Sequence, residues 1–268
     1  MNILIKVLLS ALVLFVVLYM AICAYLYFNQ ENILFRPKKL AKKFIFKFEH
    51  PHQELFFEAK DKVKLNALLF PAEHSRGLIF YLHGNSGSLN GWGDIAEVYN
   101  AKGYDLFVFD YRGFGKSEGK ISSEEQFLDD IRMLYQSMKS RYDESKIHII
   151  GYSMGTGPAT MLASENHPAQ LILLSPYYSM PDMMGQRYPF VPKFILKYKL
   201  ETYKYLGKVS VPVTIFHGKK DRSIYFGSSL KLKQHLKPGD GLFLLESQEH
   251  NGMDNNLEYQ AALDELLP

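Results

Sequence analysis

Three polar side chains occur in the order that acyl transfer by a serine nucleophile requires, and Ser153 is the first of them. Ser153 lies in the motif G-Y-S-M-G (151–155), directly after the apolar run KIHII (146–150). A strand followed at once by this motif and a helix holds a serine on a sharp turn, where small residues avoid the neighbouring strand and helix. Pro158 falls in the first helical turn, where its missing N–H breaks no bond. The pattern predicts Ser153 as a nucleophile.

A serine hydroxyl attacks a carbonyl efficiently only when a base removes its proton, and a third group must orient that base. For this type of elbow the partners follow as Asp or Glu and then His. Asp221 comes shortly after the apolar run 213–218, and His250 comes shortly after the run 242–246. Both lie just beyond predicted strand ends, where sites in parallel sheets are built. We therefore predict Asp221 as the orienting acid and His250 as the general base.

Other residues compete for these two roles. His217 is the main rival base, but it precedes Asp221, and we interpret it as a turn residue. Asp240, Glu246 and Glu249 are alternative acids. Asp240 lies in a P-G-D-G turn, and Glu249 adjoins the predicted base too closely in sequence.

Acyl transfer also needs donors that hold the oxyanion. The N–H of Met154, the residue after the nucleophile, is one predicted donor because it lies at a helix start. The second is the N–H of Asn85, in the glycine-containing loop 83–87 that follows the apolar run 78–82. His83 is predicted to hold this loop by hydrogen bonding.

The elements that must position these groups are predicted from the apolar pattern. The central runs are continuously apolar, as expected for parallel strands covered by helices on both faces. The first two strands lack a helix between them, which predicts a mixed α/β sheet of eight strands, antiparallel at its first edge and doubly wound afterwards. The predicted strands are 54–59, 64–70, 78–82, 105–110, 146–151, 171–175, 213–218 and 242–246, and the predicted helices are 91–102, 123–140, 154–166, 227–236 and 254–266.

The N-terminal region predicts a membrane anchor. Val7–Phe28 carries no charge over 22 residues, enough to cross a bilayer core of roughly 30 Å as a helix. A cleaved signal peptide is the alternative, but its apolar core is usually about 7 to 15 residues long. A lipoprotein signal would need a small residue where Ile22 stands. We predict an anchor over 1–28 and one catalytic domain over 29–268.

The side of the membrane that the domain faces stays open. Lys6 precedes the anchor, and positive charge favours the cytoplasmic side. More basic residues follow the anchor than precede it, so the rule predicts a cytoplasmic domain. The rule does not apply if these residues belong to the folded domain or contact lipid headgroups. These residues are Arg36, Lys38, Lys39, Lys42 and Lys43.

The segment 176–210 interrupts the alternation of strands and helices and is predicted to form a small cap over the site. It carries four prolines and many aromatic residues. The aromatic residues could form an apolar acyl site, with basic residues near a headgroup; an ordinary helix packed on the sheet, with its lysines in water, is the equal alternative. The substrate-binding residues predicted here are Tyr177, Tyr178, Tyr188 and Phe190.

Composition excludes several other classes. A net charge of +3 without zinc-finger spacing or an aromatic and basic strip argues against nucleic-acid binding. The only cysteine, Cys23, lies in the apolar run, so the remaining chain has no thiol chemistry. The sequence G-K-S (115–117) resembles the end of a P-loop, but Asp110 stands where its first glycine belongs. The predicted reaction needs no metal and no organic cofactor.

Five motifs in order resemble the membrane-associated abhydrolase subgroup of the α/β-hydrolases. They are HGNSG (83–87), DYRGFGKSEG (110–119), GYSMG (151–155), HGKKD (217–221) and EHN (249–251). The resemblance covers about residues 30–260 and implies the α/β-hydrolase fold and cleavage of acyl esters or thioesters. That subgroup includes protein depalmitoylases, lysophospholipid and monoacylglycerol lipases, and serine aminopeptidase-like proteins. One departure is S-I-Y (223–225), where the family usually has a valine-proline pair.

Three functions follow as hypotheses. The leading one is an esterase or thioesterase that acts on an acyl ester, a lysophospholipid or an acylated protein, with membrane lipid as its surroundings. The second is a serine peptidase that uses the same three side chains. The third is a membrane scaffold without catalysis, which the complete and correctly ordered set of residues disfavours. Acyl length and oligomeric state are not encoded in any motif.

Overall fold

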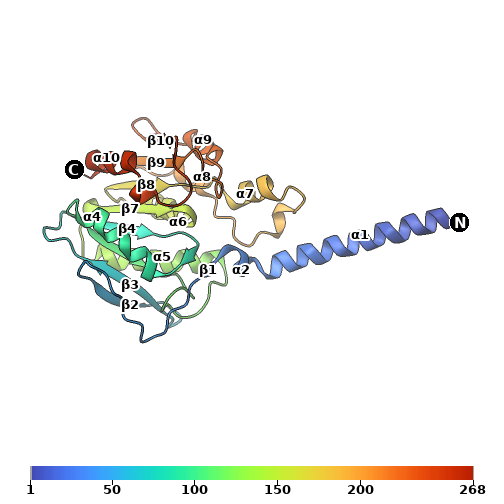
Figure 1. The fold of residues 1–268 in the computed structure, drawn as a ribbon, viewed down its shortest axis with the longest axis horizontal. Coiled ribbons are helices and arrows are strands. Elements are labelled where there is room, and N and C mark those ends of the chain that lie inside the picture. The colour runs from blue at the N-terminus through green and yellow to red at the C-terminus, as the bar shows by residue number, and fades with distance from the viewer. Residues whose placement is uncertain (1, 268) are drawn as a thin grey trace.

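A computed structural model describes residues 2–267 and contains a mixed, mostly parallel sheet (Figure 1). Within these residues the sheet has eight strands in the order β10-β9-β8-β7-β4-β6-β3-β2. β2 and β3 are antiparallel to each other, β3 is antiparallel to β6, and the other pairs are parallel. The strands are β2 (Gln53–Glu58), β3 (Lys64–Phe70), β4 (Leu78–Leu82), β6 (Asp105–Phe109), β7 (Ile147–Tyr152), β8 (Gln170–Leu174), β9 (Val213–Gly218) and β10 (Gly241–Leu245).

The predicted fold class is confirmed, and burial explains why the pattern was readable. Every residue of β4, β6, β7, β8 and β9 is buried, so these strands read as continuous apolar runs. The edge strand β2 is exposed or half-buried along its whole length. The sheet therefore has a covered centre and a solvated first edge.

Helices cover both faces of the sheet. One core contains side chains of α5 (Glu124–Lys139) and α6 (Thr156–Glu165), and the other contains side chains of α4 (Ala96–Asn100) and α10 (Leu257–Leu266). Alternate residues of β4 belong to different cores, as its pleat requires. The remaining helices of the doubly wound part are α3 (Leu89–Trp92) and α9 (Gly227–Lys233).

The helix predicted at 91–102 is divided in the structure. A 3-10 turn, Gly93–Ile95, separates α3 from α4. A Cβ at Gly93 would lie 2.3 Å from Cζ of Phe48, so the backbone passes too close to this ring for a larger residue. Glycine also weakens a helix interior, which explains the break.

The N-terminal helix α1 (Ile3–Phe28) projects away from the domain (Figure 1). None of its described residues is buried, and it is long and apolar enough to cross a membrane. It leads into α2 (Gln30–Leu34) and then into β1 (Arg36–Pro37). β1 pairs in parallel with β5 (Ser86–Gly87), and the N–H of Arg36 donates to the carbonyl of Asn85 (2.8 Å). The chain that leaves α1 is thus joined to the loop after β4.

The segment 176–210 forms short helices and loops. It contains α7 (Met180–Arg187), a 3-10 turn (Lys193–Ile195) and α8 (Thr202–Leu206). Ser179 caps α7 by accepting a hydrogen bond from the N–H of Asp182 (3.1 Å). In Figure 1, α7 and the loop after it lie on the side of the domain from which α1 leaves.

Candidate active site

Ser153 stands on a strained turn between β7 and α6. Its φ is +52°, a left-handed conformation that is uncommon for residues other than glycine and typical of functional turns. The close approach of backbones explains both motif glycines. A Cβ at Gly155 would lie 2.1 Å from the carbonyl oxygen of Leu82, and a Cβ at Gly151 would lie 2.6 Å from the Cβ atom of Ala159. The two glycines let the turn fit between β4 and α6.

Three side chains from separate loops meet at the carboxyl edge of the sheet. Nε2 of His250 lies 3.0 Å from Oγ of Ser153, and Nδ1 of His250 lies 2.7 Å from Oδ2 of Asp221. A carboxylate only accepts hydrogen bonds, so Nδ1 carries the proton and Nε2 is free to accept from the serine hydroxyl. The structure brings together all three residues that the sequence singled out.

The carboxylate of Asp221 is fixed by donors on both oxygens. Its Oδ1 accepts the N–H groups of Ser223 and Ile224, each at 2.8 Å. Burial of Asp221 favours the neutral acid, but hydrogen bonds from His217, His250 and the Ile224 N–H outweigh it and hold its pKa well below the usual value. The acid is therefore ionised and oriented, which suits it to stabilise an imidazolium.

His217 has a role that the sequence interpretation missed. It lies inside β9 and is fully buried, so its interpretation as a turn residue was wrong. Its Nε2–H donates to the carbonyl of Ile224 (2.9 Å) and lies 3.3 Å from Oδ2 of Asp221, while its Nδ1 accepts from Ser229 (2.7 Å). The position four residues before the acid, at the end of an apolar strand, was the available signal. His217 is a positioning residue for Asp221.

Replacing His217 by asparagine is expected to lower kcat for an ester about tenfold and to shift the pH profile of kcat/KM. The loss of Nε2–H removes a donor beside the carboxylate that faces His250. The matched control is His148→Asn, because His148 is a buried strand histidine that is bonded to Gln170 (2.8 Å). A uniform fall at every pH in both variants would reduce His217 to a packing role.

The predicted oxyanion donors lie beside the nucleophile. β4 pairs with β7 so that Leu82 is opposite Gly151, which places the loop after β4 next to the elbow. The side chain of Asn85 turns away and donates to the carbonyl of Leu34 (2.7 Å). Within residues 2–267, neither the Asn85 N–H nor the Met154 N–H donates to another protein group. Both donors remain the ones that we predict for an oxyanion.

Two buried side chains, His83 and Asp110, hold the loop after β4 by hydrogen bonds. Burial lowers the pKa of His83 to about 4 and raises that of Asp110 to about 8. At neutral pH both groups are therefore mostly neutral, although His83 Nε2 and Asp110 Oδ1 are 3.7 Å apart. His83 donates from Nδ1 to the carbonyl of Gly84 (2.7 Å), and Asp110 accepts the N–H of Leu89 (3.1 Å). His83 thus holds the loop by hydrogen bonding, as predicted.

The loop that carries His250 is held by buried polar groups that the sequence did not reveal. The hydroxyl of Tyr152, the residue before the nucleophile, donates to the carbonyl of His250. Farther along, the half-buried Asp254 accepts from the hydroxyls of Tyr99 (3.0 Å) and Tyr81 (3.5 Å). Burial raises the pKa of Asp254 to about 6, above the ordinary value for aspartate. These contacts tie the base to the core on the α4 side of the sheet.

Two of the four predicted substrate residues are engaged in packing. Tyr177 is fully buried, and its hydroxyl donates to the carbonyl of Met154 (3.2 Å). Tyr178 stacks on Tyr203 with ring centroids 4.5 Å apart, and its hydroxyl lies 3.4 Å from Nε2 of His235. Tyr188 and Phe190 are exposed beyond the end of α7. A substrate role remains a prediction for all four.

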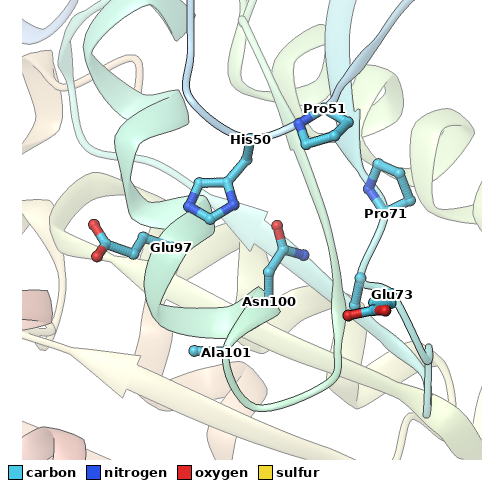
Figure 2. A pocket seen from close by; sticks show the side chains of 8 residues that line it. His50, Pro51, Pro71, Glu73, Glu97, Asn100 and Ala101 are labelled. Atoms are coloured by element: carbon cyan, nitrogen blue, oxygen red, sulfur yellow. The ribbon is translucent and has the colours of Figure 1, made fainter.

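One surface hollow lies away from these residues. It has a volume of about 530 Å³ and is lined by His50, Pro51, Pro71, Ala72, Glu73, Glu97, Asn100 and Ala101 (Figure 2). The amide of Asn100 is already used, since it donates to the carbonyls of Phe70 (3.1 Å) and Tyr104 (2.9 Å). Among the described residues, no group of three or more His, Cys, Asp or Glu is arranged to hold a metal ion.

Comparison with known families decides the membership of the chain. The model of the family described as serine aminopeptidase, S33, matches residues 73–207, which is half of the chain. The chain belongs to the α/β-hydrolase superfamily. The match contains Ser153 and ends before Asp221 and His250. This α/β-hydrolase thus has the superfamily and fold that its five motifs predicted.

Two curated relatives of this α/β-hydrolase are 30% and 33% identical to it over the aligned regions. It is 33% identical to the lysophosphatidylserine lipase ABHD12 of Danio rerio over 181 residues. This alignment covers 60% of this chain and 47% of the relative. It is 30% identical to the α/β hydrolase domain-containing protein 17C of Mus musculus over 205 residues. This alignment covers 73% of this chain and 61% of the relative. The chain therefore spans about half to three fifths of the length of these relatives.

A solved structure supports the fold independently. The esterase of Pyrococcus furiosus superposes on this α/β-hydrolase with a TM-score of 0.69 and 20% identity, over 87% of this chain and 97% of the esterase. At this identity the likeness shows the fold alone. The sheet and its flanking helices are thus those of an α/β-hydrolase.

Proposed function

We propose that this protein is a membrane-anchored serine hydrolase that cleaves carboxylic esters or thioesters of lipids or acylated proteins. The observation that carries the proposal is the hydrogen-bonded series Ser153, His250 and Asp221, with distances of 3.0 and 2.7 Å. An ionised acid, a base with a free Nε2 and a serine on a strained turn are the parts that nucleophilic acyl transfer needs.

In the proposed reaction, Ser153 attacks the carbonyl carbon while His250 takes its proton. The N–H groups of Asn85 and Met154 bind the oxyanion, and Asp221 stabilises the imidazolium. His250 then gives its proton to the leaving alcohol or thiol, which leaves an acyl-enzyme. Water, deprotonated by His250, attacks this ester, and the acid departs as Ser153 regains its proton. Each proton is returned, so the cycle needs no co-reactant besides water.

Two observations favour acyl lipids or acylated proteins as substrates. The Danio rerio relative is named for lipase activity on lysophosphatidylserine. The helix α1 is long and apolar enough to hold the domain at a bilayer surface, where such substrates are concentrated. The family description, serine aminopeptidase, supports a peptidase as the second candidate. A non-catalytic scaffold is disfavoured because the site is complete.

Labelling with a fluorophosphonate probe tests the proposal. The folded protein is expected to be modified at Ser153, as mapped by peptide mass spectrometry, whereas heat-denatured protein is not. Turnover of p-nitrophenyl esters of graded chain length, a lysophospholipid, an acyl thioester and an aminoacyl anilide would then rank the substrate classes. Preferred cleavage of the anilide would favour the peptidase, and a protein that neither labels nor turns over any substrate would contradict the proposal.

A further inference from the structure

The cap tip, residues 188–195, is docked along the end of α1. The hydroxyl of Tyr19, inside the apolar helix, donates to the carbonyl of Phe190 (2.8 Å). Nearer the domain, the amide of Gln30 donates to the carbonyl of Ile195 (2.7 Å) and accepts the N–H of Lys197 (2.8 Å). The cap tip is therefore attached to the N-terminal segment at two levels, and Phe190 marks the level farther from the domain.

The position of Tyr19 in the helix sets the depth of the cap tip. Lys6 bounds the uncharged run at its other end. The helix between Lys6 and Tyr19 is roughly 20 Å long at about 1.5 Å per residue, which is shorter than a hydrocarbon core of roughly 30 Å. If Lys6 lies at the far interface, Tyr19 lies within the hydrocarbon or at its edge, and tilt only increases this depth. The carbonyl of Phe190 must share that level.

The side chains of the cap tip suit such a position. Phe190 is 82% exposed and Phe194 is 84% exposed, an unfavourable state in water for two neighbouring aromatic rings. Lys193, between them in sequence, is also exposed and could meet anionic headgroups. A pair of this kind, with apolar rings and an adjacent cation, is typical of segments that lie in a membrane interface.

Several backbone polar groups that lipid would penalise are either absent from the cap tip or already paired. Pro189 and Pro192 have no N–H. The N–H of Val191 donates to the carbonyl of Tyr188 (3.0 Å), and the carbonyl of Phe190 is satisfied by Tyr19. Internal satisfaction of backbone groups is what a bilayer demands of any inserted segment.

We propose that the cap tip inserts into the bilayer beside α1 and forms a second lipid contact of the protein, through Phe190 and Phe194. The inference rests on the proposed role of α1 as a membrane anchor. The partner is the lipid surface, because the tip lies along an apolar helix at the depth of Tyr19. Two contacts instead of one fix the orientation of the domain and keep the cap at the source of acyl substrates.

Site-specific fluorescence tests the insertion directly. In a Cys23→Ala background, single cysteines at Phe190, Phe194 and the control position Phe56 would carry the dye NBD, in vesicles of phosphatidylcholine and phosphatidylglycerol. Phe56 is 53% exposed on the edge strand β2. We expect blue-shifted emission that lipid-borne nitroxides quench at 190 and 194, and water-like, unquenched emission at 56. Water-like emission at 190 would overturn the proposal. Blue-shifted emission without lipid quenching would overturn it too, because it indicates a protein neighbour such as a second copy.

A kinetic experiment separates this inference from the proposed function. The variant Phe194→Ser is expected to hydrolyse a lysophospholipid embedded in vesicles at least threefold more slowly, while turnover of soluble p-nitrophenyl acetate stays unchanged. Phe56→Ser should alter neither rate. Equal turnover of the vesicle substrate by the wild type and Phe194→Ser would contradict a catalytic benefit of insertion. If wild-type protein cleaves no ester, the proposed function fails, and the fluorescence result still decides the insertion.

Discussion

Replacement of either Ser153 or His250 by alanine is expected to lower kcat for a p-nitrophenyl ester by about 10⁶-fold, on the scale measured for a serine protease triad. Ser153 supplies the bond to the acyl carbon, and His250 is the group 3.0 Å away that removes and returns its proton. Neither side chain helps much without the other. The double variant should therefore be no less active than either single variant, since the two residues act as a unit.

Controls can distinguish this loss from unfolding. Ser164 lies on α6, the helix that follows the elbow, and its hydroxyl donates to the carbonyl of Met161 (2.7 Å). Ser164→Ala should keep nearly full activity, and all variants should retain the thermal midpoint of the wild type within a few degrees. Rate losses of Ser153→Ala and His250→Ala that multiply in the double variant would show that the two side chains act independently and would contradict the proposed site.

The variant Asp221→Asn is expected to lower kcat by about 10⁴-fold, the scale of the same exchange in a serine protease. Oδ1 accepts two backbone N–H groups, so an asparagine at 221 must keep its oxygen there. Its NH₂ group then faces Nδ1 of His250, where it can only donate. The imidazole is thereby forced to accept at Nδ1 and to carry its proton on Nε2. In that tautomer it cannot take the proton of Ser153.

A chemically matched control exists on the same half of the sheet. Asp240 is also nearly buried, and it accepts the N–H groups of Val213 (3.0 Å) and Lys237 (3.0 Å). Asp240→Asn therefore perturbs a similar turn without touching the site, and we expect kcat within about twofold of the wild type. Steady-state kinetics of both variants at several pH values would decide the matter. Near-normal turnover in Asp221→Asn would show that another group orients His250.

The fold was predictable because the burial of each strand determines a local pattern of apolar residues in the sequence. A strand such as β7 is buried on both faces, so it must be apolar throughout, and its glycine-flanked serine marks where it ends. The boundaries of the predicted strands differ from the observed ones by no more than one residue. The divided helix between α3 and α4 was not predictable in the same way, since its cause is the ring of Phe48, which comes from a distant segment.

The site was predictable only where chemistry dictates residue type. Nucleophile, acid and base must follow in a given order, so Ser153, Asp221 and His250 could be proposed from sequence. His217 and Asp254 could not, because their roles are defined by hydrogen-bond partners that come from other segments of the chain. The packing of Tyr177 beneath the elbow has the same origin.

The short pairing of β1 with β5 joins the segment that follows α1 to the loop that carries a proposed oxyanion donor. The carbonyls of Asn85 and Gly87 accept the N–H groups of Arg36 and Lys38, each at 2.8 Å, and the Asn85 side chain reaches back to Leu34. Release of the domain by cleavage after residue 38 would remove β1 and Leu34 from the loop that carries the Asn85 N–H. If α1 anchors the protein and the loop holds the oxyanion as proposed, a fragment without β1 would differ from the full chain in its rate constants as well as in its location. Soluble fragments for kinetic work should therefore begin before residue 34.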